Sequence, residues 1–284
     1  MTELVFLKLG GSLITDKDKP FTARLDKLAE LANEIASSWT SGRRLVLGHG
    51  SGSFGHAAAK QAGTREGLSP TPLAPTGRSP HLQSKWGEPE GGNYWKGFAE
   101  VWYRASQLNR FVMESLRAAG LPALALAPVA AVTAREMKVA AWDLSPIRAA
   151  LEAGLLPVIY GDVIFDEARG GTILSTEDLF AHLARELRPR RILLAGLEAG
   201  VWENFPARAR LVGRINLKSY ETMRARIGAS SSVDVTGGMA AKVGGMFDLI
   251  REVPGLTAQI FSAEEAGNLA RALAGKRIGT LLCT

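Results

Sequence analysis

Three glycine-containing segments of this chain each carry a lysine or histidine, a combination suited to binding phosphate. They span residues 8–12, 49–56 and 234–242. Glycines allow backbone N–H groups to approach a ligand closely, and a helix that begins in such a loop favours an anion. The first two segments each end an apolar run typical of a buried parallel strand. The sequence therefore predicts a phosphate site, and two such loops indicate two phosphate groups held at once.

The candidate catalytic residues are three lysines and one histidine. Lys8 ends a strand beside Gly10, and Lys242 lies one turn into a helix that two glycines open, so both could meet the charge of a transferring phosphoryl group. Lys17 follows the first loop closely enough to add a second cation there. His56 ends the second loop, where an imidazole suits a phosphate monoester. The alternatives are a lysine reaching solvent from a strand end, a lysine on a helix surface and a structural histidine.

The sequence lacks the motifs of several other kinds of nucleotide-binding, catalytic and metal site. The spacing of a Walker A loop is missing, and Gly50-x-Gly52-x-x-Gly55 matches a dinucleotide fingerprint without the acidic residue that should follow it. The chain has no nucleophile-elbow serine and no His/Cys metal cluster, and its single cysteine, Cys283, excludes an intrachain disulfide. The glycine loops, lysines and histidine that remain are typical of enzymes that transfer phosphoryl groups, where positioning and charge stabilisation do most of the catalysis.

The net charge of +6 over 284 residues favours either a solvated basic surface or a field that attracts anionic substrates. Nucleic acid fits less well, since no run of Lys and Arg is interleaved with stacking aromatics. No apolar run reaches membrane-spanning length, and the N-terminus lacks a signal pattern. We therefore expect a cytoplasmic protein that binds a small phosphorylated substrate and neither membranes nor nucleic acid.

Apolar runs and helical patterns alternate along the chain and predict a mainly parallel sheet covered by helices on both faces. Expected strands span residues 4–9, 44–47, 123–126, 156–160, 191–195, 257–261 and 278–282. Expected helices span residues 25–40, 52–63, 98–119, 146–153, 176–187, 240–252 and 263–274, and residues 230–235 form an extended segment. Residues 67–95 break the rhythm and predict either a lid or binding loop or a disordered insertion. Ligands of such sheets bind at the carboxyl ends of the strands, where the glycine loops lie.

Four motifs, in this order, resemble those of the amino-acid kinase superfamily. They are Lys8-Leu9-Gly10-Gly11-Ser12, the loop at residues 49–56, Pro157-Val158-Ile159-Tyr160-Gly161-Asp162 and the segment at residues 234–242. Ser53-Phe54-Gly55-His56 narrows the resemblance to the branch that contains isopentenyl phosphate kinase and its relative fosfomycin kinase. The resemblance implies an α/β fold, a three-layer αβα sandwich with a mainly parallel open sheet, in a homodimer. It also implies one continuous fold in which residues 1–165 bind the acceptor and residues 166–284 bind ATP with Mg²⁺.

The resemblance implies roles for individual residues as well. Lys8 and Lys242 would hold the transferring phosphoryl group, with Lys17 as a further stabilising cation. The residues that would contact ATP, besides these two lysines, are Gly10, Gly11, Ser12, Gly52 and Gly238. The residues that would contact the acceptor are Gly50, Ser51, His56 and Gly161. No protein side chain is expected to bind the metal, because Mg²⁺ would be carried by ATP.

The chain departs from the family pattern in three places. Ser51 stands where the glycine loop usually has its middle glycine. Ser175-Thr176-Glu177-Asp178 stands where Ser-Gly-Asp-Asp is usual, so Glu177 or Asp178 is expected to align the lysines. Residues 196–202 replace a Thr-Asp-x-Asp-Gly-Val-Tyr stretch that contacts the nucleotide.

The implied activity is ATP-dependent phosphoryl transfer to a small phosphate monoester. Isopentenyl phosphate is the first candidate, and the products would be isopentenyl diphosphate and ADP. An acceptor phosphate is already an anionic nucleophile near neutral pH, so cations are needed rather than a general base. A second hypothesis keeps the kinase and changes the acceptor to a phosphonate, as in fosfomycin kinase, or another small anion. A third is a nucleotide or metabolite sensor without turnover, which the altered residues 197–202 and Thr176 motivate.

Overall fold

A large, mainly parallel sheet forms the centre of the molecule. The computed structural model describes residues 3–40, 42–55, 91–203, 208–227 and 238–284. Within them, eight strands form one sheet in the order β12-β14-β13-β9-β1-β2-β6-β3. Their bounds are β1 (Leu4–Leu9), β2 (Arg44–His49), β3 (Ala123–Ala125), β6 (Leu156–Tyr160), β9 (Arg191–Gly196), β12 (Arg214–Asn216), β13 (Thr257–Ser262) and β14 (Thr280–Cys283). The strands from β13 to β3 run parallel and β14 runs antiparallel to β13, which confirms the predicted sheet.

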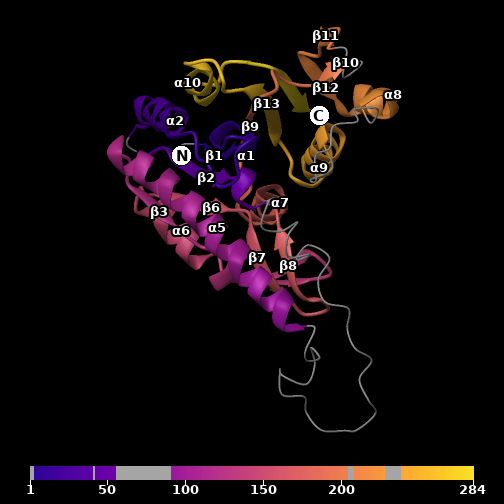
Figure 1. The fold of residues 1–284 in the computed structure, drawn as a ribbon. Helices are drawn as coiled ribbons and strands as arrows, with labels where there is room; N and C mark the ends of the chain where they lie inside the picture. The colour runs from indigo at the N-terminus through magenta and orange to yellow at the C-terminus, as the bar shows by residue number, and fades with distance from the viewer. Residues whose placement is uncertain (1–2, 41, 56–90, 204–207, 228–237) are drawn as a thin grey trace, which may run out of the picture.

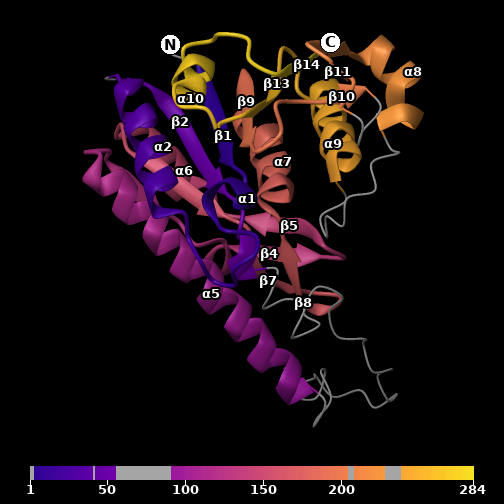
Figure 2. The same cartoon turned by 45° about the horizontal axis from the view of Figure 1, so that its top comes forward.

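Helices cover both faces of this sheet (Figures 1 and 2). One face carries α2 (Leu25–Ser37), α5 (Gly91–Ala118) and α10 (Asn268–Leu273), and the other carries α6 (Ser145–Glu152), α7 (Thr176–Leu187) and α9 (Gly238–Glu252). Successive side chains of a strand point to opposite faces. In β1, Leu4 and Phe6 accordingly join the core beneath α7 and α9, whereas Val5 and Leu7 join the core beneath α2. The predicted three-layer sandwich is therefore confirmed.

A second sheet was not predicted from the sequence. It contains β4 (Val132–Arg135), β5 (Lys138–Trp142), β7 (Asp162–Asp166) and β8 (Gly170–Leu174), in the order β5-β4-β7-β8. Only Gly161 separates β6 from β7, so residues 156–166 resemble one strand and a loop. Further short elements are α1 (Gly11–Ile14), the 3₁₀ helix η1 (Pro128–Ala130), the pair β10 (Trp202–Glu203) and β11 (Arg210–Leu211), and α8 (Leu217–Ile227).

Two predicted boundaries are wrong by more than three residues. Helix α5 begins at Gly91 rather than at residue 98, so the excursion expected to reach residue 95 ends earlier. Helix α10 begins only at Asn268, because residues 263–267 form bends and a turn that ends at Gly267 with φ +83°. The excursion up to residue 90, the later part of the helix expected at 52–63 and the segment 230–235 lie outside the described residues.

The order of the sheet places a switch point beside β1. Strand β2, which follows β1 in the chain, lies on one side of it, and β9 lies on the other. Ligands of open α/β sheets bind outside the carboxyl ends of the strands at such a point. The proposed division at residue 165 falls inside β7, which pairs with β8 across that boundary, so the functional division stays a prediction. In the described part of the chain, no helix combines the length and apolar character needed to cross a membrane.

Candidate active site

Lys8 lies near the end of β1, on the face of the sheet covered by α7. It follows Phe6 by two residues, and the Phe6 ring packs against Phe180 of α7 with centroids 5.0 Å apart. The period of the strand therefore turns Lys8 toward the start of the same helix. Lys8 is buried, and its ammonium group forms an ion pair with the carboxylate of Glu177.

Four consecutive residues at the start of α7 have different tasks. Ser175 and Asp178 form a capping box, in which the Asp178 N–H donates to Ser175 Oγ at 3.2 Å and the Ser175 N–H donates to Asp178 Oδ2 at 2.8 Å. The hydroxyl of Thr176 donates to the carbonyl of His49 at 2.6 Å and ties the helix to β2. Glu177 extends to Lys8. Of the two carboxylates expected to align the lysines, Glu177 is therefore placed to do so, whereas Asp178 caps the helix.

Lys242 lies one turn into α9, and its positive charge interacts with the same carboxylate, that of Glu177. The helix begins at Gly238, whose φ of +67° is easy for glycine alone, and the residues before it, from 228 to 237, lie outside the described part. Burial raises the pKa of Glu177, but the charges of Lys8 and Lys242 and the hydrogen bond from Lys8 outweigh it and hold that pKa below its ordinary value. The site thus contains an ionised carboxylate that attracts two ammonium groups.

These residues line a cleft of about 330 Å³ at the carboxyl ends of β1, β9 and β13. Its charged side chains are Lys8, Lys17, Lys242, Arg208, Glu177 and Glu198. Its other walls include Gly10, Ser12, Gly196 and Gly200, together with the apolar side chains of Leu194, Val201, Trp202, Met239, Ile260 and Phe261. A cleft with several cations on glycine-containing loops and an apolar wall suits a ligand that joins a polyphosphate to a flat organic group.

The two glycine loops touch each other at the switch point. A Cβ atom at Gly11 would lie 2.3 Å from the nitrogen of Gly52, and one at Gly52 would lie 2.2 Å from Thr15 Oγ1. Gly52 also has a φ of +49°, which disfavours other residues. Thr15 Oγ1 donates to Gly11 O at 2.8 Å and accepts from Ser53 N at 3.0 Å, so it links the loops. These glycines are required by backbone packing.

Three glycines expected to bind ligands use their N–H groups within the sheet. Gly10 donates to Ala195 at 2.8 Å, Gly50 to Leu9 at 3.0 Å and Gly161 to His49 at 3.3 Å. A phosphate would therefore have to find its amide donors elsewhere in the two loops. At Gly10 the missing side chain itself matters, because a Cβ atom would lie 3.1 Å from Ala195 O.

The residues expected to bind the acceptor lie on neighbouring strands. Gly50 and Ser51 follow β2, and Gly161 follows β6, which pairs with β2 through His49 and Tyr160. They do not line the described cleft, which lies on the other side of β1. His56 lies outside the described residues. The departure at Ser51 has a local effect, since its Oγ atom would be 2.1 Å from a Cβ atom at Gly55 and so requires glycine there.

The structure gives a role to residues 196–202, which depart from the family pattern, and adds Arg208 and Asn109, which the sequence patterns did not single out. Glu198 accepts hydrogen bonds from Trp202 Nε1 at 3.1 Å and from Arg208 at 2.6 Å, and all three side chains line the cleft. Arg208 lies between β10 and β11, where no helical or strand period marks it. Asn109 contacts His49 from α5, and the only sequence signal is a polar residue on an otherwise apolar helix face.

Comparisons with known proteins agree with this geometry. Residues 3–262 match the model of the amino acid kinase family. The chain is 30% identical over 284 residues to isopentenyl phosphate kinase from Methanocaldococcus jannaschii, covering 98% of this chain and 97% of the relative. It is 32% identical to isopentenyl phosphate kinase from Methanothermobacter thermautotrophicus, covering 97% of each. A solved structure of isopentenyl phosphate kinase superposes with a TM-score of 0.78 at 29% identity, covering 98% of this chain and 99% of that one.

Proposed function

The chain belongs to the amino acid kinase family, and on that basis we propose that it transfers the γ-phosphoryl group of ATP to isopentenyl phosphate, giving isopentenyl diphosphate and ADP. One observation carries the proposal: Lys8 and Lys242, from opposite ends of the chain, converge on Glu177 in a cleft at the switch point of the sheet. The relatives named above, which match over nearly the whole length, support the same activity.

Each part of the cluster has a task in this reaction. Two ammonium groups in one site repel each other, and the Glu177 carboxylate, which attracts both, lowers that cost while no substrate is bound. During transfer, negative charge spreads over the phosphoryl oxygens, and Lys8 and Lys242 stabilise it from β1 and α9. Lys17 adds a third cation from the loop after α1. The acceptor needs no general base because its phosphate oxygen is already anionic.

ATP and acceptor are proposed to lie on opposite sides of β1. The cleft beside β9, with Gly10, Gly11, Ser12, Gly52 and Gly238 at or near its edge, would take ATP. The loop after β2, with Gly50 and Ser51, and Gly161 after β6 would take the acceptor, together with His56. The transferring group would then pass over the carboxyl end of β1, where Lys8 lies.

Magnesium, a homodimer and a cytoplasmic location belong to the same proposal. The carboxylate of Glu177 is engaged by Lys8, and Glu198 accepts hydrogen bonds from Trp202 and Arg208, so Mg²⁺ would be held by the ATP phosphates, whose charge it partly neutralises. Leu124 on the edge strand β3 and Tyr103 on α5 are exposed and would be covered by a second copy of the chain.

The activity is tested by measuring ADP release with Mg-ATP and a panel of acceptors. The panel contains isopentenyl phosphate, dimethylallyl phosphate, other phosphorylated alcohols and fosfomycin. We expect isopentenyl phosphate to have the highest kcat/KM. Turnover of fosfomycin alone would indicate that the acceptor is a phosphonate. ATP binding without turnover of any acceptor would contradict the proposed kinase activity.

A pair of variants tests the cluster within that assay. Glu177→Gln keeps the shape of the side chain and removes its charge, so Lys8 and Lys242 lose their shared partner, and kcat should fall on the order of 10- to 100-fold. Asp178→Asn is the matched control because Asp178 caps α7 outside the cleft. It should lower stability with kcat nearly unchanged. Equal loss of kcat in both variants would argue against the role of Glu177.

A further inference from the structure

The imidazole of His49 is fully buried at the end of β2 and contacts three elements. Its Nδ1 atom lies 3.2 Å from the carbonyl oxygen of Gly50, in the loop that follows. Its Nε2 atom lies 3.1 Å from Oδ1 of Asn109 on α5. The ring stacks on Tyr160 of β6, with centroids 5.4 Å apart and planes 16° apart. A histidine held on all sides in this way cannot bind substrate itself.

These contacts determine which nitrogen carries the proton. Burial lowers the pKa of His49, the hydrogen bond from the ring to Gly50 opposes this, and the charge of Lys8 lowers the pKa further, which favours the neutral ring near pH 7.5. A neutral imidazole has one N–H group, and the carbonyl of Gly50 can only accept. The proton therefore belongs on Nδ1. Nε2 then has no proton, yet it faces Oδ1 of Asn109, which can only accept. We therefore infer that the Asn109 amide is turned by 180°, so that its nitrogen donates to Nε2.

The hydrogen bond to Gly50 determines the direction of the next N–H group. A trans peptide is planar, so the C=O of Gly50 and the N–H of Ser51 point in opposite directions. Holding the carbonyl toward the buried ring therefore holds the Ser51 N–H away from that ring. The peptide before Gly50 is held separately, because its N–H donates to Leu9 O at 3.0 Å.

We propose that His49 is a positioning residue that locks the Gly50–Ser51 peptide with the Ser51 N–H facing the acceptor phosphate. Glycine places little restraint on its own backbone, so this peptide can rotate when the clamp is lost. Rotation would present the carbonyl of Gly50 to the phosphate, and two anionic or partly negative groups would then face each other. The inference rests on the proposed function for the identity of the acceptor and on the geometry alone for the clamp.

The tautomer is a direct test that needs no activity. The full chain is labelled with ¹⁵N histidine, and long-range ¹H–¹⁵N correlations are recorded near pH 7.5. The His49 signals are identified by their loss in His49→Asn. We expect a neutral ring with the proton on Nδ1. A ring protonated on Nε2, or on both nitrogens, would overturn the proposal.

Two substitutions separate the nitrogens. The amide nitrogen of His49→Asn falls near the place of Nδ1 and can still donate to Gly50, whereas that of His49→Gln falls near Nε2 and cannot. His49→Gln should raise the KM for isopentenyl phosphate about tenfold, with the KM for ATP nearly unchanged, and His49→Asn should restore most of this loss. His182→Gln on α7 is the control, since that ring stacks on Trp142 and does not line the cleft.

The outcomes distinguish the two proposals. Equal effects of His49→Asn and His49→Gln, or an equal rise of both KM values, would overturn the clamp even if the kinase activity is found. If the unmodified protein turns over another acceptor, the same KM comparison is made with that acceptor. If it turns over none, the proposed function fails, and the tautomer together with the Gly50 carbonyl ¹³C shift, expected to move in His49→Gln but not in His49→Asn, still decides the clamp.

Discussion

Two carboxyl groups near the sheet edge show how surroundings decide the charge of a residue. Partial burial raises the pKa of Glu177, but the charges of Lys8 and Lys242 outweigh this effect and keep it low. Asp162, at the start of β7, accepts hydrogen bonds from the N–H groups of Val163 and Val129, and in the described part of the chain no cation is paired with it. Burial raises the pKa of Asp162 to about 7, and those two hydrogen bonds only partly oppose the rise. The surroundings of Glu177 therefore favour its ionised form, whereas those of Asp162 favour its protonated form.

The raised pKa of Asp162 predicts a pH-dependent stability. In the unfolded chain the group ionises near pH 3.8, whereas in the folded protein it keeps its proton up to about pH 7. Between these values the folded state binds the additional proton, so the contribution of Asp162 to stability falls as pH rises, by about 1 kcal/mol per pH unit. Asp162→Asn has no ionisable group at this position and therefore does not lose stability in this way. In urea unfolding we expect the free energy of unfolding of the variant, relative to that of the unmodified protein, to increase as pH rises from 4 to 7. A difference between the two free energies that stays constant over this range would contradict the assignment.

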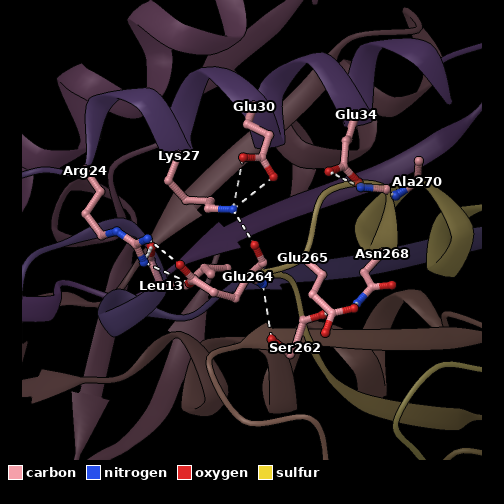
Figure 3. A network of polar contacts seen from close by, with 11 residues as sticks. Leu13, Arg24, Lys27, Glu30, Glu34, Ser262, Glu264, Glu265, Asn268 and Ala270 are labelled. Atoms are coloured by element: carbon pink, nitrogen blue, oxygen red, sulfur yellow. Dashed lines mark hydrogen bonds and ion pairs between the residues drawn. The ribbon is translucent and has the colours of Figure 1, made fainter.

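Helix α10 shows how an element without its own cap is completed by another. Its N-cap residue, Gly267, provides no side chain to accept hydrogen bonds from the first turn. Glu34 of α2 does so instead: its carboxylate accepts from the N–H of Gly267 and from the N–H of Ala270, both at 2.8 Å (Figure 3). Beside it, the buried Lys27 donates to the carbonyl of Glu264 at 2.8 Å. These contacts attach the residues after β13 to α2, near the N-terminus of the chain. The last part of β13 itself lines the cleft.

Removing the cap from α2 should therefore weaken α10. Glu34→Ala leaves the N–H groups of Gly267, the N-cap residue, and of Ala270, in the first turn of α10, without their acceptor, and we expect a loss of about 1–2 kcal/mol in the free energy of unfolding. Asn33→Ala is the control: it lies beside Glu34 on α2 with an exposed side chain, and it should change the free energy of unfolding by less than about 0.5 kcal/mol. Both are measured by urea denaturation. An equal loss in the two variants would show that the cap from Glu34 does not stabilise α10.

At the scale of the whole molecule, the switch point brings distant segments into one site. Lys8 and Lys242 are separated by most of the chain, yet both act on Glu177. Strand β1 provides the first lysine, and β9 and β13 form the neighbouring wall of the cleft. The two glycine loops meet over the end of β1 with no space for a Cβ atom between Gly11 and Gly52. The close packing of the two loops therefore shapes the end of β1, where the site lies.

A methyl group between the loops should disturb both together. In Gly11→Ala the new Cβ atom would meet the backbone of Gly52 at 2.3 Å, and backbone atoms cannot move aside as a side chain end can. We expect a loss of about 2 kcal/mol or more in stability, together with a smaller rise in Tm on addition of Mg-ATP. Gly213→Ala is the control, because nothing lies within 4 Å of the place that its methyl group would take. If the Tm of Gly11→Ala rises on addition of Mg-ATP as much as that of the unmodified protein, then the packing of the loops is not needed for nucleotide binding.

By itself, the sequence determined the layers, the family and the positions of the glycine loops that follow β1 and β2. Periodicity is local: the apolar run ending at Lys8 and the amphipathic pattern of α7 are visible within a few residues. The tertiary structure alone decided which of two adjacent acids, Glu177 or Asp178, meets the lysines, since that depends on a capping box and on the face of β1 that α7 covers. It also decided the second sheet and the clamp of His49 on Gly50, because such contacts join residues that no local pattern relates.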